Sequence, residues 1–176
     1  MEGHGAPQVL AWRHPRARGA TGRCIGKTDL PVDPRKAKRL AHRIRAVVRR
    51  EELPRLVTVS ALRRARDVGR WLARWGWRVH VDARLNELDF GAWDGLLCGA
   101  IAWSDVQAWQ DDLLNHAPGG GESLAALAAR VRSFLAEPAP AVRLSSRTAA
   151  GSTPGCMWRP VQRPWPPRTG RPRRST

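Results

Sequence analysis

The chain has 176 residues, 42% of them hydrophobic, which is enough for one globular domain with a buried core. Lys and Arg outnumber Asp and Glu by 31 to 15, and this excess taken alone favours a nucleic-acid or other anionic partner. No apolar run approaches the ~20 residues needed to span a bilayer, and the first residues carry no secretory pattern. We therefore expect a cytoplasmic protein with no membrane partner.

The distribution of the charge weakens the nucleic-acid interpretation. Residues 138–176 contain eight Arg and no Lys, Asp or Glu, so this segment alone supplies half of the net charge of +16. Arg outnumbers Lys by 28 to 3 in the whole chain, a skew that GC-rich coding produces without selection for a ligand. The sequence shows no DNA- or RNA-binding signature, and its aromatic residues show no interleaving with a basic stripe. A nucleic-acid partner is therefore not expected.

The first part of the chain alternates apolar runs with amphipathic segments. Residues 8–12 read as a strand that ends at Arg13-His14, and Asp33-Pro34 supplies an N-cap and a proline that together start a helix. The remaining elements expected in chain order are a strand at 56–59, a helix from 62 to about 76, a strand at 78–81, a loop at 85–97, a helix at 102–114, and a helix that Ser123 caps.

This alternation predicts an α/β fold with a mainly parallel sheet and helices on both of its faces. Ligands of such sheets bind beyond the carboxyl ends of the strands. His14 and Ser60 each stand just past such an end, so they are expected to lie close in space.

The character of the sequence changes after Glu137. Residues 138–176 hold eight of the fourteen prolines and show no helical or strand period. Such a segment cannot bury enough apolar surface to offset its ordering entropy. We expect a domain over residues 1–137 and a disordered tail over residues 138–176.

Four blocks of the sequence resemble the histidine-phosphatase (phosphoglycerate-mutase-like) family, in the family's order and roughly its spacing. They cover residues 8–137 and read WRHPRARGATGRCIGKTDLPV, VSALRRARDVG, LNELDFGAWDG and PGGGESLAALAARV. The second block has Ala61 where the family has proline. Within the family, the Arg-His-Pro variant and the Cys24–Pro31 segment resemble α-ribazole-phosphatase-type members.

The resemblance implies a phosphatase that works through a phosphohistidine intermediate without a metal or other cofactor. His14 would be the nucleophile, and Arg13 and Arg64 would bind the phosphate, because a neutral imidazole can accept a phosphoryl group and guanidinium groups suit its spreading negative charge. Glu87 would protonate the leaving oxygen and later activate water.

Weaker site candidates flank this group. Arg23 and Thr28 are candidate substrate contacts, and Glu122 and Ser123 either line the site or form only a turn and a helix cap. The expected substrate is a small phosphorylated molecule, α-ribazole 5′-phosphate being the candidate that the variant suggests. The oligomeric state stays open.

The sequence departs from the family at its C-terminal end. The family places a second histidine after a late apolar strand, whereas no histidine follows His116 here. We expect the sheet to lack an interior strand, and a frameshift near residues 138–143 would explain both features. The implied activity is weak or absent, and the alternative interpretations are an inactive family remnant and, less favoured, a basic nucleic-acid-binding protein.

Overall fold

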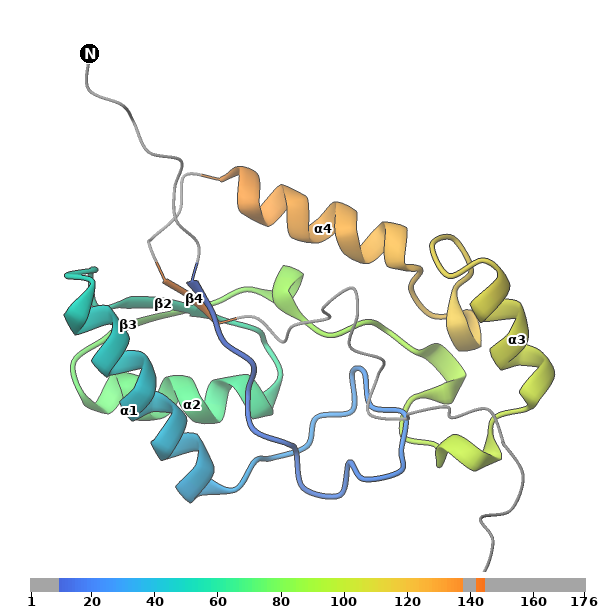
Figure 1. Cartoon of the computed structure of the whole chain (residues 1–176), viewed down its shortest axis with the longest axis horizontal. Coiled ribbons are helices and arrows are strands. Elements are labelled where there is room, and N and C mark those ends of the chain that lie inside the picture. Colours follow the sequence, from blue (N-terminus) through green and yellow to red (C-terminus); the bar gives the residue numbers. More distant parts are fainter. Residues whose placement is uncertain (1–9, 138–141, 145–176) are drawn as a thin grey trace, which may run out of the picture.

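The computed structural model of the chain describes residues 10–137 and 142–144. The described strands form one parallel sheet in the order β1-β4-β2-β3 (Figure 1). In chain order the larger elements are β1 (Leu10–Ala11), α1 (Pro34–Arg50), β2 (Leu56–Val59), α2 (Arg63–Arg74), β3 (Arg78–Val81), α3 (Trp103–Asp111), α4 (Leu124–Ala136) and β4 (Val142–Leu144). Single 3-10 turns form η1 (Ala83–Leu85), η2 (Gly91–Trp93), η3 (Cys98–Ala100) and η4 (Pro118–Gly120). The predicted α/β fold is confirmed.

Helix α1 begins where the sequence predicts, and its end is marked by a left-handed residue. The Asp33 carboxylate accepts hydrogen bonds from the backbone N–H groups of Arg35 (2.8 Å) and Lys36 (3.3 Å), which caps the first turn. At the other end Glu52 adopts a left-handed conformation with φ of 50°, and the N–H of Leu53 donates to the carbonyl of Val48 (2.9 Å). This is the pattern of a left-handed helix C-cap, which glycine usually occupies.

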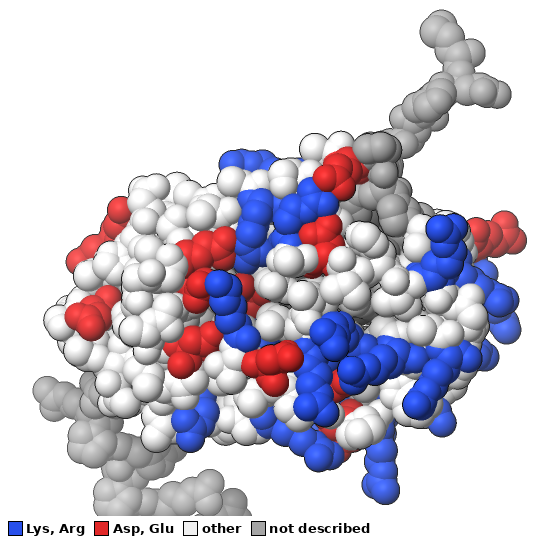
Figure 2. Space-filling view, turned by 180° about the vertical axis from the view of Figure 1, so that it is seen from behind, with Lys and Arg blue, Asp and Glu red and all other residues white. Residues whose placement is uncertain are grey.

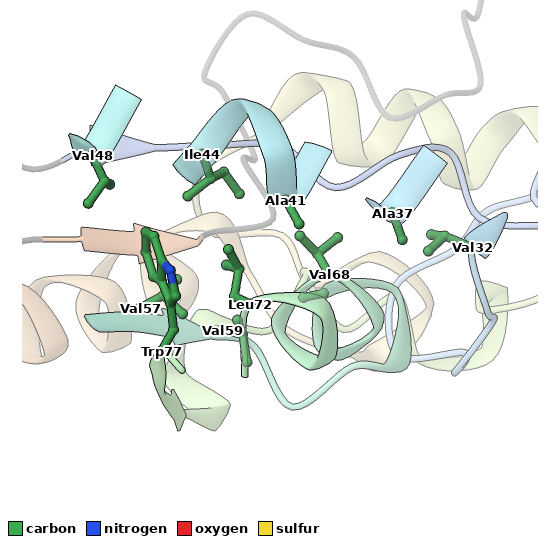
Figure 3. Packing of buried hydrophobic residues seen from close by; sticks show 11 residues of the cluster. Val32, Ala37, Ala41, Ile44, Val48, Val57, Val59, Val68, Leu72 and Trp77 are labelled. Atoms are coloured by element: carbon green, nitrogen blue, oxygen red, sulfur yellow. The ribbon is translucent and has the colours of Figure 1, made fainter. Parts of the chain in front are cut away.

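The main core lies between α1, α2 and the sheet (Figure 3). Its members repeat at helical spacing along the two helices, and Val57 and Val59 of β2 point from the strand to one and the same face of the sheet. Gly69 lets α2 approach the sheet, because a Cβ there would lie 3.1–3.2 Å from side-chain carbons of Val79 and Val59. Figure 1 shows α1 and α2 on one side of the sheet and α4 on the other. The fully or nearly fully buried residues are Val32, Ala37, Ala41, Ile44, Val48, Val57, Val59, Ala65, Val68, Leu72 and Trp77.

Strand β4 corrects the sequence analysis. It pairs with β1 on one side and with β2 on the other, so it lies inside the sheet. The expectations that no strand follows residue 137 and that the sheet lacks an interior strand are therefore wrong for Val142–Leu144. Backbone N–H and C=O groups make the ladder, so Arg143 within the run does not exclude pairing. The rest of the predicted tail lies outside the described residues.

A second hydrophobic cluster forms beside the sheet from the predicted loop region and α3. Phe90 and Trp93 each meet Trp109 edge-on, with ring centroids 6.0 Å apart. The triple glycine fits against this region, since a Cβ on Gly121 would lie 2.1 Å from the carbonyl oxygen of Asp89. The helix expected at 102–114 is shorter, ending at Asp111. None of the described helices is long and apolar enough to cross a membrane.

Candidate active site

Three of the residues that the sequence singled out lie at the carboxyl edge of the sheet. Arg13 and His14 follow β1, and Ser60 follows β2, two parallel strands that both flank β4. Ser60 is fully buried, Arg13 is exposed and His14 is half-buried. The strand order therefore brings together segments that lie 46 residues apart, at the edge where such sheets bind ligands.

One contact fixes the tautomer of His14. Its Nδ1 lies 2.7 Å from the carbonyl oxygen of Pro15, and a carbonyl can only accept a hydrogen bond. Nδ1 therefore carries the proton and Nε2 keeps its lone pair. Burial, together with the nearby positive charges of Arg64 and Arg13, lowers the pKa of His14 from 6.5 to about 4 against the opposing Pro15 contact. The ring is neutral near pH 7 and can act as a nucleophile.

Glu87 shares the electrostatic environment of His14. Burial raises the pKa of its carboxyl group, while the N–H of Leu88 and the charges of Arg64, Arg13 and Arg130 oppose that rise. Arg13 and Arg64 thus act on both His14 and Glu87. A raised carboxyl pKa is the direction that a general acid requires.

Arg64 is also a structural clamp. It is only 2% exposed, and its guanidinium donates to the carbonyl oxygens of Thr28 (3.0 Å) and Gly26 (2.6 Å). A guanidinium carries five N–H donors, and these two contacts use two of them. The neighbouring Arg63 is exposed, and its backbone N–H donates to the carboxylate of Asp29.

Asp94, which the sequence analysis did not single out, holds the same loop from its other side. Its carboxylate accepts hydrogen bonds from the backbone N–H groups of Gly26 (3.0 Å), Lys27 (2.5 Å) and Thr28 (3.0 Å), and from the Thr28 hydroxyl (2.7 Å). Arg64 donates to backbone carbonyls of the 26–28 segment, and Asp94 accepts from its backbone N–H groups. Together they fix the loop that packs against the site.

Thr28 and Arg23 therefore have structural partners. The Thr28 hydroxyl is bound to Asp94, and the Arg23 guanidinium donates to the carbonyl oxygen of Gly95 (2.8 Å). Neither contact places the side chain beside His14, so their roles as substrate contacts stay predictions.

Glu122 and Ser123 separate into two roles. The Ser123 hydroxyl accepts from the N–H of Ala126 (3.2 Å), which makes it the N-cap of α4, one of the two alternatives left open. Glu122 forms a two-pronged ion pair with Arg130 (2.6 and 2.8 Å). Glu122 is thus linked to the candidate site by its ion pair with Arg130.

Arg130 is a second residue that the sequence analysis passed over. Besides Glu122, it donates to the carbonyl oxygens of Arg84 (2.6 Å) and Glu87 (3.1 Å). It therefore ties α4 and the glycine-rich turn to the backbone of the candidate acid. The Arg-Val pair at the end of the fourth sequence block was the available signal.

Neither a metal site nor the second histidine is apparent in the described part of the chain. Across residues 10–137 and 142–144, His, Cys, Asp and Glu side chains form no group of three or more that could hold a metal ion. The last histidine of the sequence, His116, follows α3, and the residues after β4 lie outside the described ranges.

Comparison with known proteins gives a consistent result. The family model described as the histidine phosphatase superfamily (branch 1) matches residues 9–143. Glucosyl-3-phosphoglycerate phosphatase of Mycobacterium tuberculosis (strain CDC 1551 / Oshkosh) is 39% identical over 126 residues, which cover 64% of this chain and 56% of that protein. The chain thus spans little more than half the length of this relative.

Solved structures resemble this fold as well. The complex of mycobacterial glucosyl-3-phosphoglycerate phosphatase with inorganic phosphate has a TM-score of 0.65 at 30% identity, covering 81% of this chain and 73% of the other. The α-ribazole phosphatase of Shigella flexneri has a TM-score of 0.65 at 22% identity, covering 78% and 72%. The second likeness is one of fold alone.

Proposed function

The chain belongs to the histidine phosphatase superfamily, and from this premise we propose that it hydrolyses phosphomonoesters through a phosphohistidine on His14. The observation that carries the proposal is the contact of His14 Nδ1 with the Pro15 carbonyl, which leaves Nε2 unprotonated, while the charges of Arg13 and Arg64 act on both His14 and Glu87. The proposal makes no statement about the oligomeric state. The cytoplasmic location stays a prediction from the sequence.

The residues support a two-step reaction. In the first step Nε2 of His14 attacks phosphorus, the ester P–O bond breaks, and the leaving oxygen takes the proton of Glu87. In the second step water attacks the phosphohistidine, Glu87 accepts a proton from that water, and the P–N bond breaks to release inorganic phosphate. Arg13 and Arg64 hold the oxygens of the phosphoryl group in both steps.

The proposal includes an impaired rate. The sequence after His116 lacks the second histidine that the family resemblance implies, and loss of one such electrostatic partner costs on the order of 10²–10³ in rate. The alternative is an inactive family remnant, in which the rate falls to zero. The full chain also spans only part of its relatives, so the activity belongs to the proposal.

Hydrolysis of a generic aryl phosphate tests the proposal. We expect slow phosphate release that disappears in His14→Gln and persists in His80→Gln, which alters an exposed histidine on β3. Release that is equal in His14→Gln and the unaltered chain would refute the role of His14. A rate typical of enzymes, median about 10 s⁻¹, would refute the impairment.

The frameshift hypothesis has its own test, which needs no protein. Translating the other two frames of the coding DNA beyond codon 137 should give an apolar strand followed by His-Gly or His-Ala. If neither frame does so, the frameshift hypothesis fails.

Two substrates call for direct comparison. The Arg-His-Pro variant and the Cys24–Pro31 segment support α-ribazole 5′-phosphate, a precursor in cobalamin assembly. The 39% identity to a relative named for glucosyl-3-phosphoglycerate supports that second compound. Measuring kcat/KM for both, with the aryl phosphate as reference, decides between them. Equal kcat/KM values for all three compounds would contradict both assignments.

A further inference from the structure

A basic surface lies away from the candidate active site, on the outer faces of α1 and α2. Helix α1 carries eight Lys and Arg residues, all exposed, and no Asp or Glu. Helix α2 adds four exposed arginines and a single acid, Asp67, which is paired with Arg70. Figure 2 shows Lys and Arg side chains gathered over this half of the molecule. We call this surface the α1–α2 face.

Aromatic rings lie among these cations. Lys38 and Arg74 lie over the ring of Trp71 at 5.1 and 5.0 Å, and Arg45 lies over Trp75 at 5.3 Å. This corrects the expectation that aromatic residues do not interleave with a basic stripe. Sequence spacing hides the pattern because the cations of α1 meet rings that belong to α2 and to the residue that follows it.

The arrangement prepares the cations for an anion. A guanidinium resting on an aromatic ring loses less side-chain freedom on binding, while its N–H donors remain available to phosphate oxygens. Such cation–aromatic surfaces with a basic path are typical of single-strand binding.

A groove of about 450 Å³ adjoins the face at the amino edge of the sheet, opposite His14. Helix carbonyls from the ends of α1 and α2 contribute roughly one unit of negative charge there, about half a unit from each helix. Three arginines and one glutamate line the groove, which gives a net charge of +2. This exceeds the negative charge of the helix ends, so the groove stays positive overall. The groove residues are Arg45, Val48, Arg49, Glu52, Leu53, Arg55, Trp75 and Trp77.

The character of the surface distinguishes among anionic partners. The large hydrophobic side chains that are exposed in the described chain all lie outside α1 and α2, so the face offers nothing to insert into a lipid layer. Its cations, held on the half-buried rings of Trp71 and Trp75, suit a chain of phosphates, and the adjoining groove is of small-molecule size. We infer that the α1–α2 face and its groove bind single-stranded nucleic acid, independently of the proposed phosphatase reaction.

Fluorescence anisotropy of the full chain with a labelled single-stranded RNA of about 12 nucleotides tests the inference. The face variant Lys38→Gln/Arg45→Gln/Arg74→Gln keeps good helix formers at exposed positions. The matched control Arg16→Gln/Arg132→Gln/Arg168→Gln removes the same charge elsewhere. A third variant changes the seven arginines after residue 144 to Gln.

We expect the face variant to bind at least tenfold more weakly. The slope of log K against log salt should become shallower by about two, because each neutralised phosphate of a single strand contributes ~0.7 to that slope. The matched control should bind within twofold of the unaltered chain. Equal weakening in the face variant and its control, or weakening only in the tail variant, would overturn the inference. So would equally tight binding to polyglutamate or to anionic phosphatidylglycerol vesicles.

Discussion

At the scale of single residues, the environment of His14 makes a testable pH prediction. The folded pKa of about 4 lies below the ordinary 6.5, so between these values the unfolded chain binds more protons than the folded one. The His14 contribution therefore lowers the free energy of unfolding as pH falls from 6.5 to 4, by at most roughly 3 kcal/mol. Above pH 6.5 the contribution no longer changes with pH. NMR titration of the ring, assigned with His14→Gln, should give a midpoint near 4, and a midpoint near 6.5 would contradict this environment.

A second residue-scale prediction concerns Asp94. Asp94→Asn removes the charge that accepts three backbone N–H bonds, and we expect a loss of roughly 2–3 kcal/mol in the free energy of unfolding. Asp112→Asn is the control, because that exposed carboxylate accepts only local bonds from Asn115. Denaturant unfolding measures both. A loss below about 0.5 kcal/mol, the size of an ordinary surface change, would show that the loop needs no such clamp.

The residues of the candidate site differ in how far sequence could identify them. His14, Arg64 and Glu87 stand in recognisable blocks, and in the structure the charge of Arg64 acts on both His14 and Glu87. Asp94 and Arg130 stand in the same blocks, but they bind backbone groups of distant loops. No residue pattern specifies which loop will present its N–H groups or carbonyls, so the partners of Asp94 and Arg130 are found only in the fold.

At the scale of elements, the C-terminus of α1 makes a stability prediction. Glu52 is the one described non-glycine residue with positive φ, a conformation that costs about 1 kcal/mol for residues with a Cβ. Glu52→Gly should therefore raise the free energy of unfolding by about that amount. Glu51→Gly is the control, since Glu51 has φ of −89° and gains nothing from glycine. Thermal or urea unfolding should separate the two variants, and equal effects would contradict the cap.

The loop beside the site gives a matched pair of glycines. A Cβ on Gly26 would lie 2.2 Å from the carbonyl oxygen of Leu88, whereas a Cβ on Gly99 would meet nothing within 4 Å. We expect Gly26→Ala to destabilise the fold by about 2 kcal/mol or more, by forcing the backbone apart. Gly99→Ala should be neutral or slightly stabilising. Similar unfolding midpoints for both variants would contradict this packing.

The elements themselves followed the sequence where periodicity was strong. The N-cap and apolar spacing of α1, the run of β2 and the strand at 78–81 all appear in the structure. Strand β4 was missed because Arg143 interrupts a short apolar run, and pairing between β1 and β2 is a property of the sheet rather than of those three residues.

At the scale of the whole molecule, the fold has two distinct surfaces, although the composition shows only one overall excess of positive charge. The carboxyl edge of the sheet carries Arg13 and His14 of the candidate site, and the α1–α2 face with its amino-edge groove carries much of the described basic charge. The family and the α/β fold could be recognised from sequence, while the cation–aromatic contacts required two helices to be packed together.

The central claim is that His14 accepts a phosphoryl group. Intact-mass analysis under alkaline conditions, after incubation of the full chain with an aryl phosphate, tests it most directly. We predict one added phosphoryl group that maps to His14 and is absent in His14→Gln, with slow release into water. Labelling that persists in His14→Gln, or hydrolysis with no dependence on His14, would contradict the claim.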